Sequence, residues 1–169
     1  LGAGQMVSEN TDTRRASELR VEAADALDRR DDGNRLAALY GLTPKVESAI
    51  VAAIREGAED RCRALVAPLH PADQADLLER LPKPQSAALV RMLGDGLDAE
   101  ALAYLGETTR DEIVDVMGMA ALARQLPDLD TDDAVNIIEE LEQDEIDDVL
   151  AALPAEDRVL VEELSLIHI

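Results

Sequence analysis

The stretch Leu69-His-Pro-Ala-Asp-Gln-Ala-Asp-Leu-Leu-Glu-Arg80 is the first of a series of similar units of 12 residues. One apolar residue returns at every twelfth position, and from the second position onward a mostly apolar pair precedes it by three and four residues. The recurring residues are Leu69, Leu81, Leu93, Leu105, Met117, Leu129, Leu141 and Leu153. Self-similarity at a fixed short period is the signature of a repeat architecture.

A single long helix is incompatible with this period. Twelve residues turn an α-helix by about 1200°, which leaves successive repeat positions about 120° apart and gives no stripe to bury. Helix breakers recur with the units, at Pro71, Pro82, Pro84, Gly94, Gly96, Gly106, Gly118, Pro127 and Pro154. Each unit is therefore predicted to be a helix of about eight residues and a turn of about four, stabilised by stacking on its neighbours. The expected fold is all-α, an α-solenoid or compact superhelix.

The recurring residues also predict where the core lies. We expect Leu105 and Leu141 to be buried at helix ends. Before the repeat, apolar spacing predicts a helix over 45–54 that Gly57 ends, and a second helix over 59–67. Helix N-caps are expected at Asp73, Asp98, Thr109, Thr131 or Asp132, and Asp144.

Three regions follow from these patterns. Residues 1–43 are rich in Ser, Thr, Asn, Gly and charge, so we predict a flexible arm with one helix over 16–27. Residues 44–165 form the acidic helical-repeat domain. The last four residues, 166–169, are apolar and out of register, which suggests a foreign tail or a truncated chain.

The charge is large and uneven. The net charge is −21, and residues 69–169 hold 25 acidic and six basic side chains. Such a surface repels phosphate backbones and anionic lipids, and attracts cations or a basic protein surface. Cys62 is the sole cysteine, which excludes an internal disulfide, and no apolar run reaches the roughly 18–20 residues that span a bilayer. We expect a soluble cytosolic chain.

No catalytic constellation is found. The sequence has no Ser/His/Asp or Cys/His arrangement and no glycine-rich phosphate loop, so we predict that it is not an enzyme. The densest charge lies in residues 128–148, with 11 acids and no Lys or Arg. Carboxylates alone suit hard cations such as Mg²⁺ and Ca²⁺, although a plain solvated surface is the alternative. An EF-hand over Asp128–Glu139 is a further alternative, but Asp133 stands where its loop needs Gly.

Two segments resemble a known family. Leu69-His-Pro-Ala-Asp-Gln-Ala-Asp-Leu-Leu-Glu-Arg-Leu-Pro82 resembles the opening motif of the N-terminal cytosolic domain of MgtE-type magnesium transporters. Leu129-Asp-Thr-Asp-Asp-Ala-Val-Asn-Ile-Ile-Glu-Glu-Leu141 is similar to its later Asp-Asp-Ala-x-Asp-Leu-Leu segment, and the resemblance covers roughly residues 45–165. It implies a right-handed superhelix, followed in the family by two CBS repeats and a membrane pore.

The resemblance also implies a function. In the family, Mg²⁺ binds between the acidic faces of the cytosolic domains, draws them together and closes the pore of a membrane homodimer. Carried onto this chain, the positions that face the CBS domains are Asp132, Asn136 and Glu100. The family usually has Asp where Asn136 stands, and an amide oxygen ligates without charge, so a weaker contact is implied. The expected function is a Mg²⁺-sensing regulatory domain at the cytoplasmic face of the membrane, present here as a fragment. The alternative is an acidic scaffold that docks a basic surface without metal.

Overall fold

The computed structural model describes residues 41–166, and within this range the chain forms helices and no strand. The helices are α2 (Pro44–Glu56), α3 (Glu59–Val66), α4 (Pro71–Arg80), α5 (Lys83–Leu93), α6 (Ala99–Tyr104), α7 (Glu107–Met117), α8 (Met119–Gln125), α9 (Thr131–Glu140), α10 (Gln143–Ala152) and α11 (Ala155–Leu166). Two short 3-10 helices, η1 (Gly94–Gly96) and η2 (Leu126–Asp128), complete the series. The prediction of an all-α fold is confirmed.

The predicted arm over 1–43 and tail over 166–169 fall mostly outside the described range. Residues 1–40, with the helix expected over 16–27, and residues 167–169 are not described. Thr43 is the N-cap of α2, where its Oγ1 accepts from the Val46 amide at 3.3 Å. Leu166 is the last residue of α11. No helix within residues 41–166 has the length and apolar character that a membrane span requires.

The first two helices form as their spacing predicts. The apolar stripe of α2 buries Val46, Ile50 and Ala53, and α3 buries Cys62 and Leu65 on the same core. Gly57 ends α2 with a φ of 66°, in the left-handed region that glycine adopts without the steric cost of a Cβ.

The 12-residue period corresponds to one helix and its turn. Leu81, Leu105, Leu141 and Leu153 each cap the C-terminus of a helix, while Leu93 and Met117 are the last residues of α5 and α7. The helices are 6 to 13 residues long rather than a uniform eight. The shortest, α6 and α8, share their units with η1 and η2, which take up the remaining turn.

The two burial predictions have different outcomes. Leu105 is buried, with 3% of its surface exposed, as predicted. Leu141 is only partly buried, so that prediction is wrong. Leu153, the recurring residue of the next unit, is buried again, with 3% of its surface exposed.

Most of the predicted caps are wrong. Asp98 is the N-cap of α6, and its side chain accepts from the Glu100 amide. His70 caps α4 in place of Asp73, through Nδ1, because Pro71 starts the helix directly after it. Gly106 precedes α7 and leaves Thr109 inside the helix, Asp130 precedes α9, and Glu142 caps α10 in a reciprocal capping box with Glu145.

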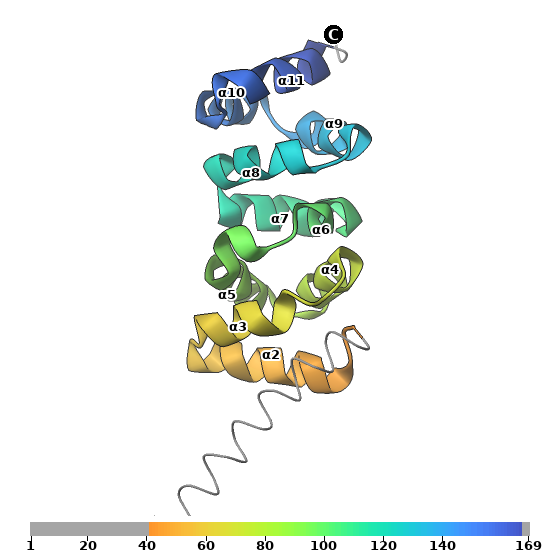
Figure 1. Cartoon of the computed structure of the whole chain (residues 1–169), viewed down its shortest axis with the longest axis vertical. Helices are drawn as coiled ribbons and strands as arrows, with labels where there is room; N and C mark the ends of the chain where they lie inside the picture. The colour runs from red at the N-terminus through yellow and green to blue at the C-terminus, as the bar shows by residue number, and fades with distance from the viewer. Residues whose placement is uncertain (1–40, 167–169) are drawn as a thin grey trace, which may run out of the picture.

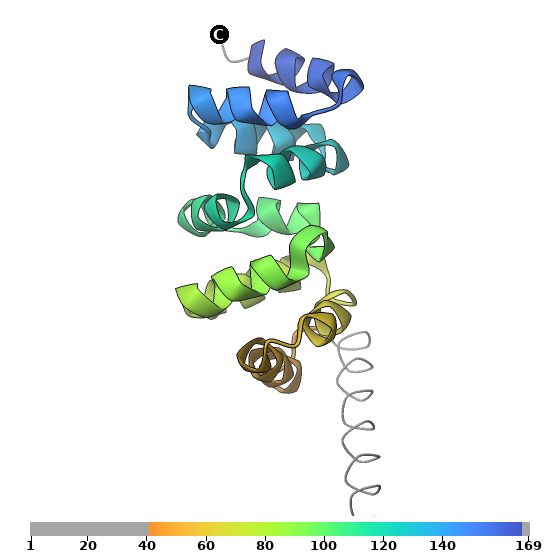
Figure 2. The ribbon, with the colours of Figure 1, turned by 90° about the vertical axis from the view of Figure 1, so that its left-hand side faces the viewer.

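The helices lie across the long axis of the molecule and follow one another from α2 at one end to α11 at the other (Figures 1 and 2). Many of the contacts join units two apart in sequence: α5 packs on α3 and α7, α4 on α6, α8 on α10, and α9 on α11. Within α3–α7 and within α8–α11, consecutive helices therefore belong to alternate columns, whereas α2 packs on α3 and α7 packs on α8 directly. The core between them is continuous and aliphatic.

Four ion pairs also join units that are two apart in sequence. The pairs Arg80–Glu47, Lys83–Glu112, Arg124–Asp95 and Arg110–Glu140 join residues 29 to 33 positions apart, each between units that are two apart. Their charges therefore reinforce the stacking that apolar burial produces.

In three units, the main-chain carbonyl of the recurring residue accepts a hydrogen bond from a side chain. The donor is the polar residue five positions later. Gln74 donates to Leu69 O at 3.1 Å, Arg110 to Leu105 O at 2.9 Å, and Arg158 to Leu153 O at 3.3 Å. These carbonyls lie at helix ends, where the regular helical pattern leaves them without an amide donor. The repeat thus contains a polar position as well as an apolar one.

Candidate functional site

The acidic run over 128–148 begins in η2 and extends along α9 and α10. Most of its carboxylates are exposed to solvent. Three are engaged locally, because Glu142 and Glu145 form the capping box of α10, and Asp147 accepts from the Gln143 amide at 3.1 Å. Glu140 pairs with Arg110 of α7.

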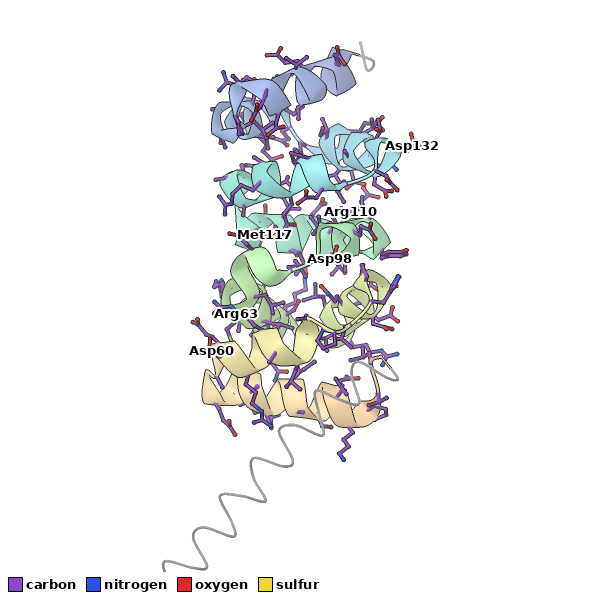
Figure 3. The ribbon with its side chains drawn as sticks, viewed as in Figure 1. Asp60, Arg63, Asp98, Arg110, Met117 and Asp132 are labelled. Carbon is purple, nitrogen blue, oxygen red and sulfur yellow. The ribbon has the colours of Figure 1, made fainter. Side chains whose placement is uncertain are left out.

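Asp132 and Asn136 lie one turn apart on α9, so their side chains share a face of that helix. Both are exposed. Figure 3 shows Asp132 at the edge of the stack, pointing away from the core. Two oxygen donors in this arrangement could provide part of a hard-cation site whose other ligands came from outside the described residues.

Glu100 lies elsewhere, on the short helix α6. It lines a hollow of about 440 Å³ together with Asp95, Asp98 and Asp128, and its own amide donates to Asp98 Oδ1 at 3.0 Å. Asp132 and Asn136 do not line this hollow. The structure therefore pairs Glu100 with the start of the acidic run, rather than with the two residues on α9.

No group of three or more His, Cys, Asp or Glu side chains within residues 41–166 is arranged to hold a metal ion. The donor chemistry of Asp132 and Asn136 still fits Mg²⁺, which accepts carboxylate and amide oxygens and keeps several of its own waters. The EF-hand alternative is excluded. Residues 131–140 form the continuous helix α9, so the segment that would be the calcium loop is already helical from its fourth position.

Arg110 is a functional candidate that the sequence analysis missed. It projects from α7, and its side chain is only 12% exposed. Nε donates to Leu102 O and Nη2 to Leu105 O, both at 2.9 Å, while Nη1 contacts both carboxylate oxygens of Glu140 at 2.7 and 2.9 Å. One guanidinium thus ties the end of α6 to the last residue of α9, the helix that carries Asp132 and Asn136.

A second missed feature is the use of buried amides. Gln74 donates to Leu69 O and accepts from the Asp98 amide at 3.1 Å, and Gln125 donates to Leu97 O at 3.1 Å. Both glutamines therefore hold the loop that precedes α6 and Glu100. Gln125 is a buried polar residue at a position that is apolar in most units, and its side chain is the one that contacts this loop.

The one cysteine is not a nucleophile in this fold. The Cys62 side chain is fully buried, and that desolvation raises the pKa of its thiol, an effect that nearby Arg61 opposes in part. A raised pKa lowers the thiolate fraction at neutral pH, and burial denies access to a substrate. The thiol contacts Met92 at 3.7 Å, as part of the core.

Comparison with known sequences agrees with the helical repeat. No curated protein sequence matches the chain. The family described as the MgtE intracellular N domain matches residues 69–166, which is more than half of the chain and includes the units from α4 to α11. It describes a domain of a transporter and not a family of enzymes. The chain therefore belongs to the MgtE intracellular N domain family.

Proposed function

We propose that this chain is the Mg²⁺-sensing regulatory domain of a magnesium transporter. Its membership of the MgtE intracellular N domain family carries the proposal. On this proposal the domain lies at the cytoplasmic face of the membrane, in a transporter that is a homodimer, and docks on the CBS domains of the same transporter when Mg²⁺ is plentiful.

The chemistry of the acidic run supports this function. Asp132 and Asn136 offer exposed oxygen donors, and neighbouring carboxylates raise the local concentration of divalent cations. When bound, Mg²⁺ would neutralise charge between two acidic faces. Asp132 would hold it with its carboxylate, and Asn136 would orient it through an uncharged amide oxygen. Glu100 is proposed as a separate contact, on the hollow that it shares with Asp128.

Thermal unfolding tests the proposal on this chain. The comparison is between about 5 mM MgCl₂ and NaCl of matched ionic strength, because a specific ligand stabilises the native state beyond charge screening. We expect a modest extra rise in Tm with Mg²⁺, since α9 offers one carboxylate and one uncharged amide as ligands. Asp132→Ala should remove the extra rise, whereas Asp148→Ala, an exposed acid of the same run on α10, should retain it.

Docking requires the partner. Calorimetric titration of the chain with a CBS-domain protein should show binding that depends on Mg²⁺ and weakens in Asp132→Ala. The charge of the acidic run also favours the second candidate, a scaffold that docks a basic surface without metal. If the Tm values are equal in both salts and partner binding does not depend on Mg²⁺, the sensor function is wrong. The scaffold function would then be supported.

A further inference from the structure

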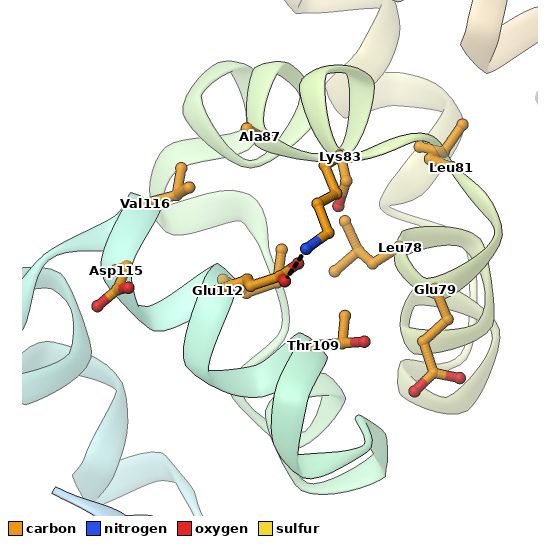
Figure 4. A pocket seen from close by; sticks show the side chains of 11 residues that line it. Leu78, Glu79, Leu81, Lys83, Ala87, Thr109, Glu112, Asp115 and Val116 are labelled. Atoms are coloured by element: carbon orange, nitrogen blue, oxygen red, sulfur yellow. Dashed lines mark hydrogen bonds and ion pairs between the residues drawn. The ribbon is translucent and has the colours of Figure 1, made fainter.

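A second hollow, of about 390 Å³, lies where α4, α5 and α7 meet (Figure 4). It is distant in sequence from Asp132 and Asn136, which lie on α9. Five of its lining residues are aliphatic, drawn from all three helices: Leu78, Leu81, Ala87, Ile113 and Val116. An apolar lining interrupted by a few polar groups is the usual composition of a ligand site, and the volume falls near the small end of the usual range.

A buried hydroxyl in this lining lacks a partner. Ser86 is 5% exposed, and its Oγ has no hydrogen bond to any described residue. An unsatisfied buried polar group costs about 1–3 kcal/mol, so native structures rarely retain one without a reason. An occupant with a hydrogen-bonding atom would satisfy it.

The charges beside the hollow are unbalanced. Glu79, Glu112 and Asp115 bring three carboxylates, against the single ammonium of Lys83. Glu79 already accepts from the Gly106 amide at 2.8 Å. Lys83 pairs with Glu112 across the hollow, as Figure 4 shows, but the Lys83 side chain is 80% exposed. Exposed ion pairs contribute little, so another cation can replace Lys83 as the partner of Glu112.

We propose that this hollow docks a segment of a partner protein that presents an aromatic side chain with a polar edge beside a Lys or Arg. The ring would contact the aliphatic lining, its polar edge would bond Ser86 Oγ, and the cation would pair with Glu112. Aromatic and basic residues are the common anchors of protein interfaces, and the net charge of −21 steers basic segments to this chain. The proposal is independent of the magnesium site.

The composition of the chain provides a clean assay. It contains no Trp, so the fluorescence of a Trp-containing peptide reports binding to the full chain without background. The probe is acetyl-Lys-Trp-Lys-amide. One control, acetyl-Lys-Ala-Lys-amide, lacks the aromatic ring and is measured by calorimetry. The other control, acetyl-Glu-Trp-Glu-amide, lacks the cations and is measured by fluorescence. We expect saturable binding with a blue shift of the Trp emission. The two comparison peptides should bind at least about tenfold more weakly, because each lacks one anchor.

Variants locate the binding. Ala87→Leu fills the hollow and should abolish it, while Ala64→Leu, on the exposed surface of α3, should leave it unchanged. Ser86→Ala should weaken binding roughly three- to tenfold through the lost hydrogen bond. Glu112→Gln should weaken it and reduce its salt dependence. If circular dichroism shows that Ala87→Leu perturbs the fold, the test rests on Ser86→Ala and Glu112→Gln instead.

Two results would overturn the proposal. Binding that survives both Ala87→Leu and Glu112→Gln would be unspecific attraction to the acidic surface. Free tryptophanamide that binds as tightly as the tripeptide would show a site for a small aromatic amine rather than a docked segment.

Discussion

Two regions of this molecule share one repeat and differ in charge. We name residues 44–117 the N-terminal stack and residues 119–166 the C-terminal stack. The N-terminal stack has 14 acidic and eight basic side chains, whereas the C-terminal stack has 15 acidic and two basic ones. Both bury aliphatic side chains at matching positions of the repeat. Apolar spacing therefore determines the fold in both regions, and charge distinguishes what each surface can attract.

The ion pairs show what this difference means for stability. Arg80–Glu47 and Lys83–Glu112 lie within the N-terminal stack, and Arg124–Asp95 and Arg110–Glu140 join the two stacks. The C-terminal stack has too few bases to neutralise its own acids. Its stability should therefore depend more on its neighbour and on solution cations.

The largest expected effect compares two equivalent repeat positions. Leu105→Ala should lower the free energy of unfolding by about 2–5 kcal/mol, because it leaves a cavity in the core of the N-terminal stack. Leu141→Ala should cost only about 1 kcal/mol, since the side chain is partly exposed already. Urea unfolding of both variants measures the difference. Equal losses would mean that the C-terminal stack is packed as tightly as the N-terminal one.

The connection between the stacks gives the next effect. Arg110→Met should cost about 2–3 kcal/mol, because it leaves Glu140 and two main-chain carbonyls without their donor. Arg124→Met removes a bridge whose side chains are 57% and 75% exposed, and should cost less than about 1 kcal/mol. Chemical unfolding measures both. A ranking in the opposite order would show that Arg110 does not hold the stacks together.

A smaller effect concerns salt. Between low ionic strength and about 0.15 M NaCl, where the Debye length is about 8 Å, screening should relieve repulsion in the C-terminal stack. Amide hydrogen exchange of α9 and α10 should slow by roughly two- to fivefold, with a weaker response in α4 and α5. Asp147→Asn together with Asp148→Asn should reduce the response. The same response in both stacks would contradict the assignment of repulsion to the acidic run.

The smallest effect concerns a thiol in each stack. Cys62 lies in the N-terminal stack, and Ala134, 2% exposed on α9, is a matched position in the C-terminal stack. In a Cys62→Ala background, Ala134→Cys should react with a thiol reagent faster than Cys62 does in the natural chain, because reaction requires local opening. Slower reaction at residue 134 would show that the C-terminal stack opens less readily than the N-terminal stack, contrary to this prediction.

The pH dependence of Cys62 has a definite sign. Burial raises the pKa of its thiol in the folded chain above the usual value for cysteine. Below the unfolded pKa both states keep the proton, and the thiol adds no pH dependence. Above about pH 9 the unfolded state loses its proton first, so the free energy of unfolding falls as pH rises. Cys62→Ala should lack this part of the fall in urea unfolding at pH 7, 9 and 10.

The sequence predicted helices well and long-range polar contacts poorly. The 12-residue spacing predicts helix ends because a buried residue must return to the same core at each layer, and Leu105 shows this. The same spacing does not determine how completely each position is covered, because Leu141 is half-buried although Leu153, one unit later, is buried. Two of the predicted caps failed because Pro71 and Gly106 determine where α4 and α7 begin, and the predicted Asp73 and Thr109 then lie inside those helices.

The candidate site was predictable only in part. The acidic run can be read from composition, whereas Asp132 and Asn136 were placed by the family resemblance. Glu100 was placed by resemblance, and its hollow with Asp128 depends on a loop held by two buried glutamines. Arg110 and Glu140 are 30 residues apart, and nothing local marks them as partners. A search for opposite charges about 30 positions apart would have found this pair.

The alternation of columns restricts how such a chain can change in length. Within α3–α7 and within α8–α11 a helix packs on the unit after next, so removing one unit of 12 residues from either run would send the later helices of that run to the opposite column, with their ion pairs separated. Removing or duplicating two units, 24 residues, would keep each helix in its column. The indivisible module of this architecture is therefore a pair of helices, and lineages or designs that lengthen it should do so in steps of two.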